Sequence, residues 1–233
     1  MRTTRLFDQQ GELKRRAKMK KVILLVVLFT SFVGILGAQP KVGVKIGLNM
    51  ANVGSENDME IIHTQFGAHL GAMLQYPVIP RFLVQTELLY TMKGYIYKSS
   101  DLVNNSAYKN NGGFDYLEIP ILFKYNAIFP SIKFQPYMGT SIGLLLAAQA
   151  KLKTTYEGQS HCYNVDLKKD MKDFDLGLNL GIDTVIMEGL TIGLRYNIGL
   201  NKIYHDSMDL KNDDKANKNR TLMLSFGHLM DLD

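Results

Sequence analysis

The sequence predicts an all-β fold: an eight-stranded antiparallel up-and-down barrel that crosses a membrane. Three observations lead to this prediction: large apolar side chains alternate with small or polar ones, an export signal precedes them, and short and long connections alternate. In residues 41–50 the large apolar positions are Val42, Val44, Ile46, Leu48 and Met50. Strict alternation places such side chains on one face of a strand. In an exported chain, repeated segments of this kind are typical of a transmembrane barrel.

Eight segments are expected to be strands: residues 41–50, 66–76, 82–96, 114–127, 133–148, 174–186, 190–204 and 221–230. Each is close to or longer than the roughly 9 to 11 residues that a tilted strand needs to cross a bilayer. Three connections are short turns, at residues 77–81, 128–132 and 187–189. Four are long, polar loops, at residues 51–65, 97–113, 149–173 and 205–220. This asymmetry predicts that the turns and both termini face the periplasm and that the long loops face outward.

Residues 1–38 have the pattern of a signal peptide. A basic cluster precedes the short apolar run 22–36, and small residues follow it. We expect cleavage between Ala38 and Gln39, which leaves residues 39–233 as the mature barrel. A second methionine, Met19, directly precedes the last two lysines before the apolar run, so translation from Met19 is expected to suffice for export.

The leader accounts for the basic character of the chain. It holds 8 of the 27 basic and 2 of the 22 acidic residues, so the mature chain carries 19 positive and 20 negative charges. The basic isoelectric point therefore gives no reason to expect a nucleic-acid partner. The single cysteine, Cys162, excludes an internal disulfide framework.

Glycines indicate which face of the strands lies inside the barrel. They occupy the polar face in four of the predicted strands, at Gly43, Gly47, Gly67, Gly71, Gly139, Gly143, Gly177 and Gly181. An eight-stranded barrel has barely enough interior room for side chains, so the face that carries the glycines is expected to be the interior.

Charged residues then fall on the interior positions Lys45, Glu87, Lys93, Glu118, Lys124, Asp175, Asp183 and Arg195. Buried charges are costly unless they are paired. One antiparallel register would place Lys93 opposite Glu118 and also Glu87 opposite Lys124, and Asp183 could meet Arg195 across the following turn. We expect these three pairs to neutralise the lumen.

Aromatic residues gather near the predicted strand ends. Tyr76, Phe82, Tyr125, Phe129 and Phe134 lie beside the short turns, and a second group lies towards the long loops, at Tyr90, Tyr95, Tyr97, Phe114 and Tyr116. Such clusters are typical of the interfacial girdles of membrane barrels, although aromatics are also common in any strand.

The sequence gives little indication of catalysis. The five histidines have no metal-ligand spacing, and His161, Cys162 and Asp166 share one loop without an orienting motif. We therefore expect no catalytic residues, no metal and no cofactor, and we do not expect an enzyme.

Five segments together resemble the outer-membrane β-barrel domain family that is often labelled porin-like: residues 43–49, 85–90, 116–120, 136–139 and 193–197. The resemblance covers residues 40–230. It implies an eight-stranded barrel in a Gram-negative outer membrane, and most members of this family have no assigned activity. Some related barrels are accessories of secretion and gliding machinery.

Three classes of function stay open. A structural or interaction barrel, with membrane lipid around it and a protein partner at the long loops or periplasmic turns, is favoured because the lumen is filled. A small diffusion pore is the alternative that the family label suggests, and strand number distinguishes the two because only wider barrels hold a water channel. An outer-membrane enzyme would require His161 to converge with an acid and a nucleophile.

Overall fold

The computed structural model describes residues 39–54, 62–101, 106–128, 132–156, 159–186, 189–205 and 218–232. The expected signal peptide lies outside these residues, and so does Ala38, whereas Gln39 is the first residue described. No helix in the described part of the chain is long and apolar enough to span a membrane.

All regular structure in the described residues is β-strand. The strands are β1 (Lys41–Gly54), β2 (Ile62–Ile79), β3 (Phe82–Asp101), β4 (Ser106–Tyr125), β5 (Ala127–Ile128), β6 (Lys133–Tyr156), β7 (Gln159–Asp166), β8 (Phe174–Ile186), β9 (Leu190–Gly199) and β10 (Lys218–Asp231).

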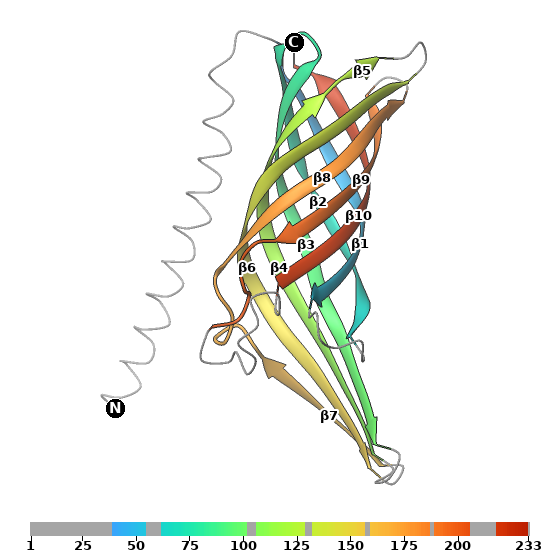
Figure 1. Cartoon of the computed structure of the whole chain (residues 1–233), viewed down its shortest axis with the longest axis vertical. Coiled ribbons are helices and arrows are strands. Elements are labelled where there is room, and N and C mark those ends of the chain that lie inside the picture. Colours follow the sequence, from blue (N-terminus) through green and yellow to red (C-terminus); the bar gives the residue numbers. More distant parts are fainter. Residues whose placement is uncertain are drawn as a thin grey trace, which may run out of the picture. The chain divides into compact units, whose positions relative to one another are not determined.

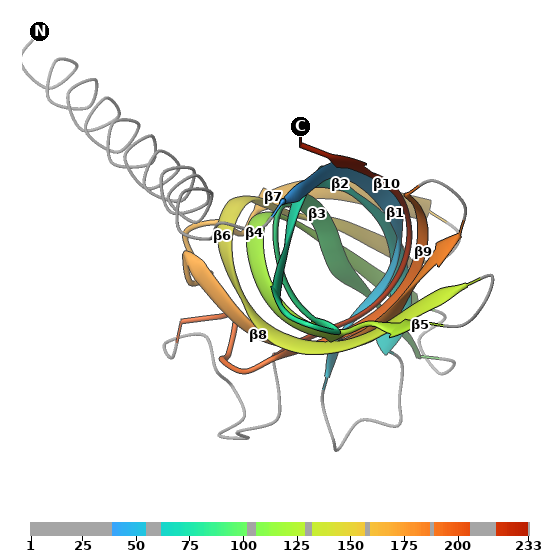
Figure 2. The same ribbon diagram turned by 90° about the horizontal axis from the view of Figure 1, so that it is seen from above.

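Eight of these strands close into a ring (Figure 2). Neighbours along the ring follow the order β4, β3, β2, β1, β10, β9, β8 and β6, and the pairing of β4 with β6 closes it. All pairs are antiparallel, including β1 with β10, which joins the first strand to the last. The predicted eight-stranded up-and-down barrel is thus confirmed.

The short connections lie at one end of the barrel and the long ones at the other (Figure 1). We call these the turn end, which includes residues 80–81 and Gly189, and the loop end. The short strand β5 lies at the turn end, while β7 lies at the loop end.

Strand lengths differ from the prediction mainly at the loop end. β3 and β4 continue through most of the expected loop 97–113, and β6 continues to Tyr156. The expected loop 149–173 contains β7, which pairs with β6 from Gln149↔Asp166 to Tyr156↔Gln159. By contrast, the predicted strand 190–204 ends at Gly199. Backbone pairing continues beyond the apolar belt because hydrogen bonds between strands do not require lipid.

The side-chain pattern confirms the predicted faces. On β1, Val44, Ile46 and Leu48 are 58–63% exposed, whereas Lys45 and Asn49 are buried. An exterior of this composition is stable only when lipid covers it. At the turn end, the rings of Phe82 and Tyr125 lie 5.3 Å apart at the rim of this apolar band.

The turn between β8 and β9 requires a glycine. Gly189 has φ +89°, which L side chains rarely adopt, and a Cβ atom there would collide with the carbonyl oxygen of Leu229. We expect Gly189→Ala to lower the free energy of unfolding by at least about 1 to 2 kcal/mol, the cost of left-handed backbone. Gly113→Ala is the matched control, because its Cβ would meet only the Gln65 amide at 3.6 Å. Urea unfolding in lipid vesicles measures both, and equal stabilities would contradict this reading of the turn.

Candidate functional site in the barrel interior

The barrel interior gathers the charged side chains into two clusters. All eight predicted interior charges are buried, each 3% exposed or less: Lys45, Glu87, Lys93, Glu118, Lys124, Asp175, Asp183 and Arg195. They come from β1, β3, β4, β8 and β9, at positions that alternate with the lipid-facing residues. Four are cations and four are anions, so the set is neutral as a whole.

The first cluster, which we call the Glu87 cluster, consists of Lys45, Glu87, Lys124, Asp183 and Arg195. Glu87 accepts bonds from Lys45 Nζ at 2.8 Å and from Arg195 Nη2 at 2.8 Å. Lys124 Nζ lies 2.5 Å from Asp183 Oδ2, and Lys45 Nζ lies 3.7 Å from the same oxygen. Lys45 therefore connects the two acids into one network that carries three positive and two negative charges.

Neutral groups complete the coordination of this cluster. Tyr137 accepts a hydrogen bond from Arg195 Nε at 3.1 Å, and its ring lies 5.1 Å from Lys124 Nζ. The side-chain amide of Gln85 donates to Glu87. Such partners matter because a buried ion pair stabilises only when its remaining donors and acceptors are also satisfied.

The second cluster, the Lys93 cluster, lies nearer the loop end. Lys93 Nζ lies 2.6 Å from Glu118 Oε1 and 3.2 Å from Asp175 Oδ2. Asn197 Oδ1 accepts a third bond from Lys93 at 3.1 Å, and Asn219 Nδ2 donates to Asp175 at 2.8 Å. This cluster carries one positive and two negative charges.

A buried histidine fills the space beside these clusters. His69 Nδ1 lies 2.7 Å from Asn49 Oδ1, and Nε2 lies 2.9 Å from Ser225 Oγ. A Cβ atom on Gly47 would collide with the His69 ring. Gly47 therefore provides the room that the ring occupies, as expected for glycines on the interior face.

The predicted charge partners require correction. Lys93 contacts Glu118, but Glu87 contacts Lys45 and Arg195 in place of Lys124, and Asp183 contacts Lys124 in place of Arg195.

The reason is the register between strands. Lys93 lies opposite Phe114 rather than opposite Glu118, a shift of four residues from the predicted register. Across the next turn, Asp183 lies opposite Gly193. In a narrow barrel, long side chains reach partners on strands across the lumen, and sequence separation within one hairpin does not select among these partners.

An apolar cluster closes the loop end of the lumen. This outer cap comprises Val53, Phe114, Tyr116, Leu145, Ala148, Met171 and Ile203, all buried. Met171 and Ile203 come from segments that follow β7 and β9 and fold inward. Backbone hydrogen bonds hold the two segments together, from Lys172 N to Ile203 O at 2.8 Å and from His205 N to Asp170 O at 3.0 Å.

The outer cap corrects two expectations. Phe114 and Tyr116 belong to the lumen rather than to a lipid-facing girdle, and Tyr95 packs against Phe114 with ring centroids 5.8 Å apart. The sequence did contain this signal, because Phe114 and Tyr116 share the parity of Glu118 on the same strand. Residues 167–173 and 200–205, taken as polar loop and strand end, cover the mouth instead.

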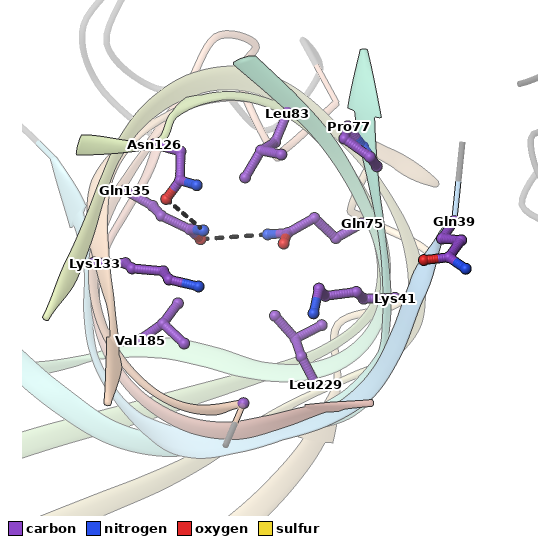
Figure 3. A pocket seen from close by; sticks show the side chains of 11 residues that line it. Gln39, Lys41, Gln75, Pro77, Leu83, Asn126, Lys133, Gln135, Val185 and Leu229 are labelled. Carbon is purple, nitrogen blue, oxygen red and sulfur yellow. Dashed lines mark hydrogen bonds between the residues drawn. The ribbon is translucent and has the colours of Figure 1, made fainter. Parts of the chain in front are cut away.

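At the turn end the lumen opens into a polar pocket of about 260 Å³ (Figure 3). Gln75 Nε2 donates to Gln135 Oε1 at 3.3 Å, and Gln135 Nε2 donates to Asn126 Oδ1 at 3.4 Å. Lys41 and Lys133 line the same pocket, and Lys41 pairs with Asp231 at 2.7 Å. Gln39, the expected first residue of the mature chain, also lines it.

The residues weighed for catalysis lie along β7 and do not converge. His161 is opposite Thr154, Cys162 is opposite Lys153 and Asp166 is opposite Gln149. Every residue of β7 is exposed, and the Asp166 carboxylate accepts a hydrogen bond from the backbone of Lys168. Among the described residues, no group of three or more His, Cys, Asp or Glu side chains is placed to hold a metal ion.

Comparisons with known proteins agree with this architecture. A family model described as "Outer membrane protein beta-barrel domain" matches residues 38–205, which run from the start of β1 beyond the end of β9. Among curated proteins, no sequence matches the chain.

Three solved structures illustrate the likeness of fold. Ail, the attachment invasion locus protein of Yersinia pestis, is 16% identical over 82% of this chain and 99% of its own, with a TM-score of 0.42. Neisserial surface protein A is 14% identical over 82% and 97%, with a TM-score of 0.38. Outer membrane protein W of E. coli is 16% identical over 84% and 100%, with a TM-score of 0.36.

Proposed function

Because the chain belongs to the outer membrane protein β-barrel domain family, we propose that it is a closed barrel that conducts no solutes and acts through an exposed sheet at its loop end. The observation that carries this proposal is the filled lumen. Two buried ion-pair clusters and the outer cap occupy successive levels of an eight-stranded ring.

The clusters oppose conduction for an energetic reason. An ion that crossed the lumen would have to break contacts such as Glu87 with Arg195 or Lys93 with Glu118 and leave buried charges unpaired. Breaking a buried pair costs about 3 to 5 kcal/mol. Beyond the clusters, the ion would also have to cross the apolar cap, where no polar group replaces its hydration shell.

The second part of the proposal rests on strands that continue beyond the barrel. The ends of β3, β4 and β6, together with β7, form a sheet at the loop end (Figure 1). We call residues 95–101, 106–112, 149–156 and 159–166 the protruding sheet. Long connections of outer-membrane barrels face the outside of the cell. This sheet is then the largest ordered surface that the protein presents there, and it supports an interaction role rather than transport.

A small diffusion pore is the second candidate, and the polar pocket at the turn end favours it. This pocket opens the lumen as far as Gln75 and Gln135. For a pore, both the ion-pair clusters and the outer cap would have to rearrange. The two candidates therefore make opposite predictions in a bilayer.

We expect the purified protein to show no stable large conductance in planar bilayers. A variant with an opened cap, Ile203→Ser together with Met171→Ser, should also remain closed, because the Glu87 and Lys93 clusters still fill the lumen beneath it. Reproducible porin-sized steps from the wild-type protein would favour the diffusion pore. Conductance by the cap variant alone would show that the cap, and not the ion pairs, is the barrier.

A further inference from the structure

Lysines line up across the protruding sheet. Lys98 of β3 lies directly opposite Lys109 of β4, and Lys109 lies directly opposite Lys153 of β6. Lys151 is two residues from Lys153 on β6, and all four side chains are exposed. Neighbouring strands are about 4.8 Å apart. The row therefore places three positive charges across roughly 10 Å of one face.

The barrel exterior continues into this face. On β4, Lys109 has the same parity as the lipid-facing residues Leu117 and Phe123, and on β3, Lys98 has the same parity as Met92. The bulge in β6 opposite Asp115 and Tyr116 brings Lys153 onto the same side. The row is thus directed outward, away from the lumen and its acids.

The fold does not benefit from this arrangement. Like charges directly opposite each other on neighbouring strands are destabilising. In the part of the chain that the structure describes, none of the four lysines has an ion-pair partner. The described acid on β7, Asp166, lies opposite Gln149 and accepts a bond from the Lys168 backbone. A charge row that lowers stability and lacks partners has the properties of a binding surface.

The position of the row indicates what can reach it. On β4 the apolar lipid-facing run ends at Leu117, and Lys109 lies eight residues further along the strand. At about 3.3 Å per residue and a tilt of about 45°, the row stands roughly 18 Å beyond the apolar belt. The headgroup layer occupies only about 5 to 8 Å on each side of the hydrocarbon. Lipid headgroups are therefore too low to neutralise these lysines.

We propose that the lysine row, Lys98, Lys109 and Lys153 with Lys151 beside it, binds an anionic polysaccharide that lies outside the membrane, beyond the lipid headgroups. A polymer with regularly spaced sulfate or carboxylate groups matches a row of point charges, which need no fixed bonding angle. This inference rests on the proposed function, because it names the partner class for the protruding sheet.

A second copy of the chain is a poorer occupant of this region. The outer edge of β7 has no strand partner among the described residues, and a symmetric copy could in principle pair with it. Cys162 on β7 lies opposite Lys153, so such pairing would extend the row of three lysines into a row of six. The added repulsion opposes this dimer unless a polyanion is present.

The test measures binding of the full mature protein in phosphatidylcholine nanodiscs to fluorescent dextran sulfate, with uncharged dextran as the neutral polymer. Nanodiscs leave both ends of the barrel accessible. We expect Lys109→Gln with Lys153→Gln to weaken dextran sulfate binding about ten-fold at low salt and to reduce its salt dependence, because two counterion-releasing contacts are lost. Lys133→Gln with Arg81→Gln removes the same charge at the turn end and should change binding less than two-fold.

The possible outcomes separate the two proposals. Equal losses in both double variants, or binding that ignores the lysine row, would overturn the polysaccharide site. Binding only to vesicles that contain anionic lipid, with none to dextran sulfate, would also overturn it, as would association of protein copies without polymer. The double variant should unfold at the same or higher urea concentration than the wild type, which separates a binding defect from misfolding. Conductance in planar bilayers would overturn the closed-barrel proposal without affecting this measurement.

Discussion

Replacing Glu87 with glutamine should destabilise the barrel by about 3 to 5 kcal/mol, the usual cost of breaking a buried ion pair. Glu87 accepts from both Lys45 and Arg195, and all three side chains are buried. The neutral amide would leave an excess of positive charge in a region where Lys124 already lies close by. The measurement is the free energy of unfolding in lipid vesicles, obtained from urea titration.

A double-mutant cycle identifies the partner of Glu87. Glu87→Gln and Arg195→Met should be strongly coupled, because either change alone leaves the other charge without its partner. Glu87→Gln and Lys93→Met belong to different clusters and should be additive within about 0.5 kcal/mol. Comparable coupling in both cycles would contradict the division of the lumen into two clusters.

The second large effect is expected on the lipid-facing side. Leu180 is 43% exposed near the middle of β8, where Met138 and Tyr196 flank it on the neighbouring strands. Leu180→Arg should cost about 2 to 4 kcal/mol, the penalty for a cation at the bilayer midplane.

The same substitution near a strand end provides the control. Met230 is also exposed and lies one residue before the end of β10. Met230→Arg should cost only about 0 to 1 kcal/mol, because its guanidinium reaches the interface. Equal costs at the two positions, measured by unfolding in vesicles, would mean that the apolar band is not centred on Leu180.

The alternation of residue types was sufficient to predict the ring and its two faces. A period of two is a local property, so Val44, Lys45 and Ile46 indicate their own directions without knowledge of the rest of the chain. Burial of all eight interior charges followed from the same pattern.

Partners within the lumen depended on information that the pattern does not contain. Glu87 meets Arg195, which is 108 residues away in sequence, because the ring brings β3 and β9 to face each other. The strand pairing also passes over Glu87 and Leu88, next to Pro120, which has no N–H to donate to a ladder. A register fitted to complementary charges in one hairpin could not include these constraints.

The outer cap was missed for a different reason. Met171 and Ile203 are single apolar residues in polar segments, and no periodicity marks them. Their burial depends on Phe114 and Tyr116, which project into the mouth from β4. The parity of those two aromatics was readable, whereas the inward folding of the segments that cover them is a tertiary effect.

The pairing of β1 with β10 has a consequence for how the protein is made. It joins Lys41 to Asp231 and continues through Gly54↔Lys218, so nearly the whole mature chain separates the partners in sequence. Contacts of such high sequence separation form slowly, since the entropy of closing a long loop is lost before the contacts are gained. Until β10 has been exported, β1 has an open edge that other chains can pair with. Ring closure therefore requires that the unfolded chain be kept from aggregating in the periplasm until its last strand has arrived.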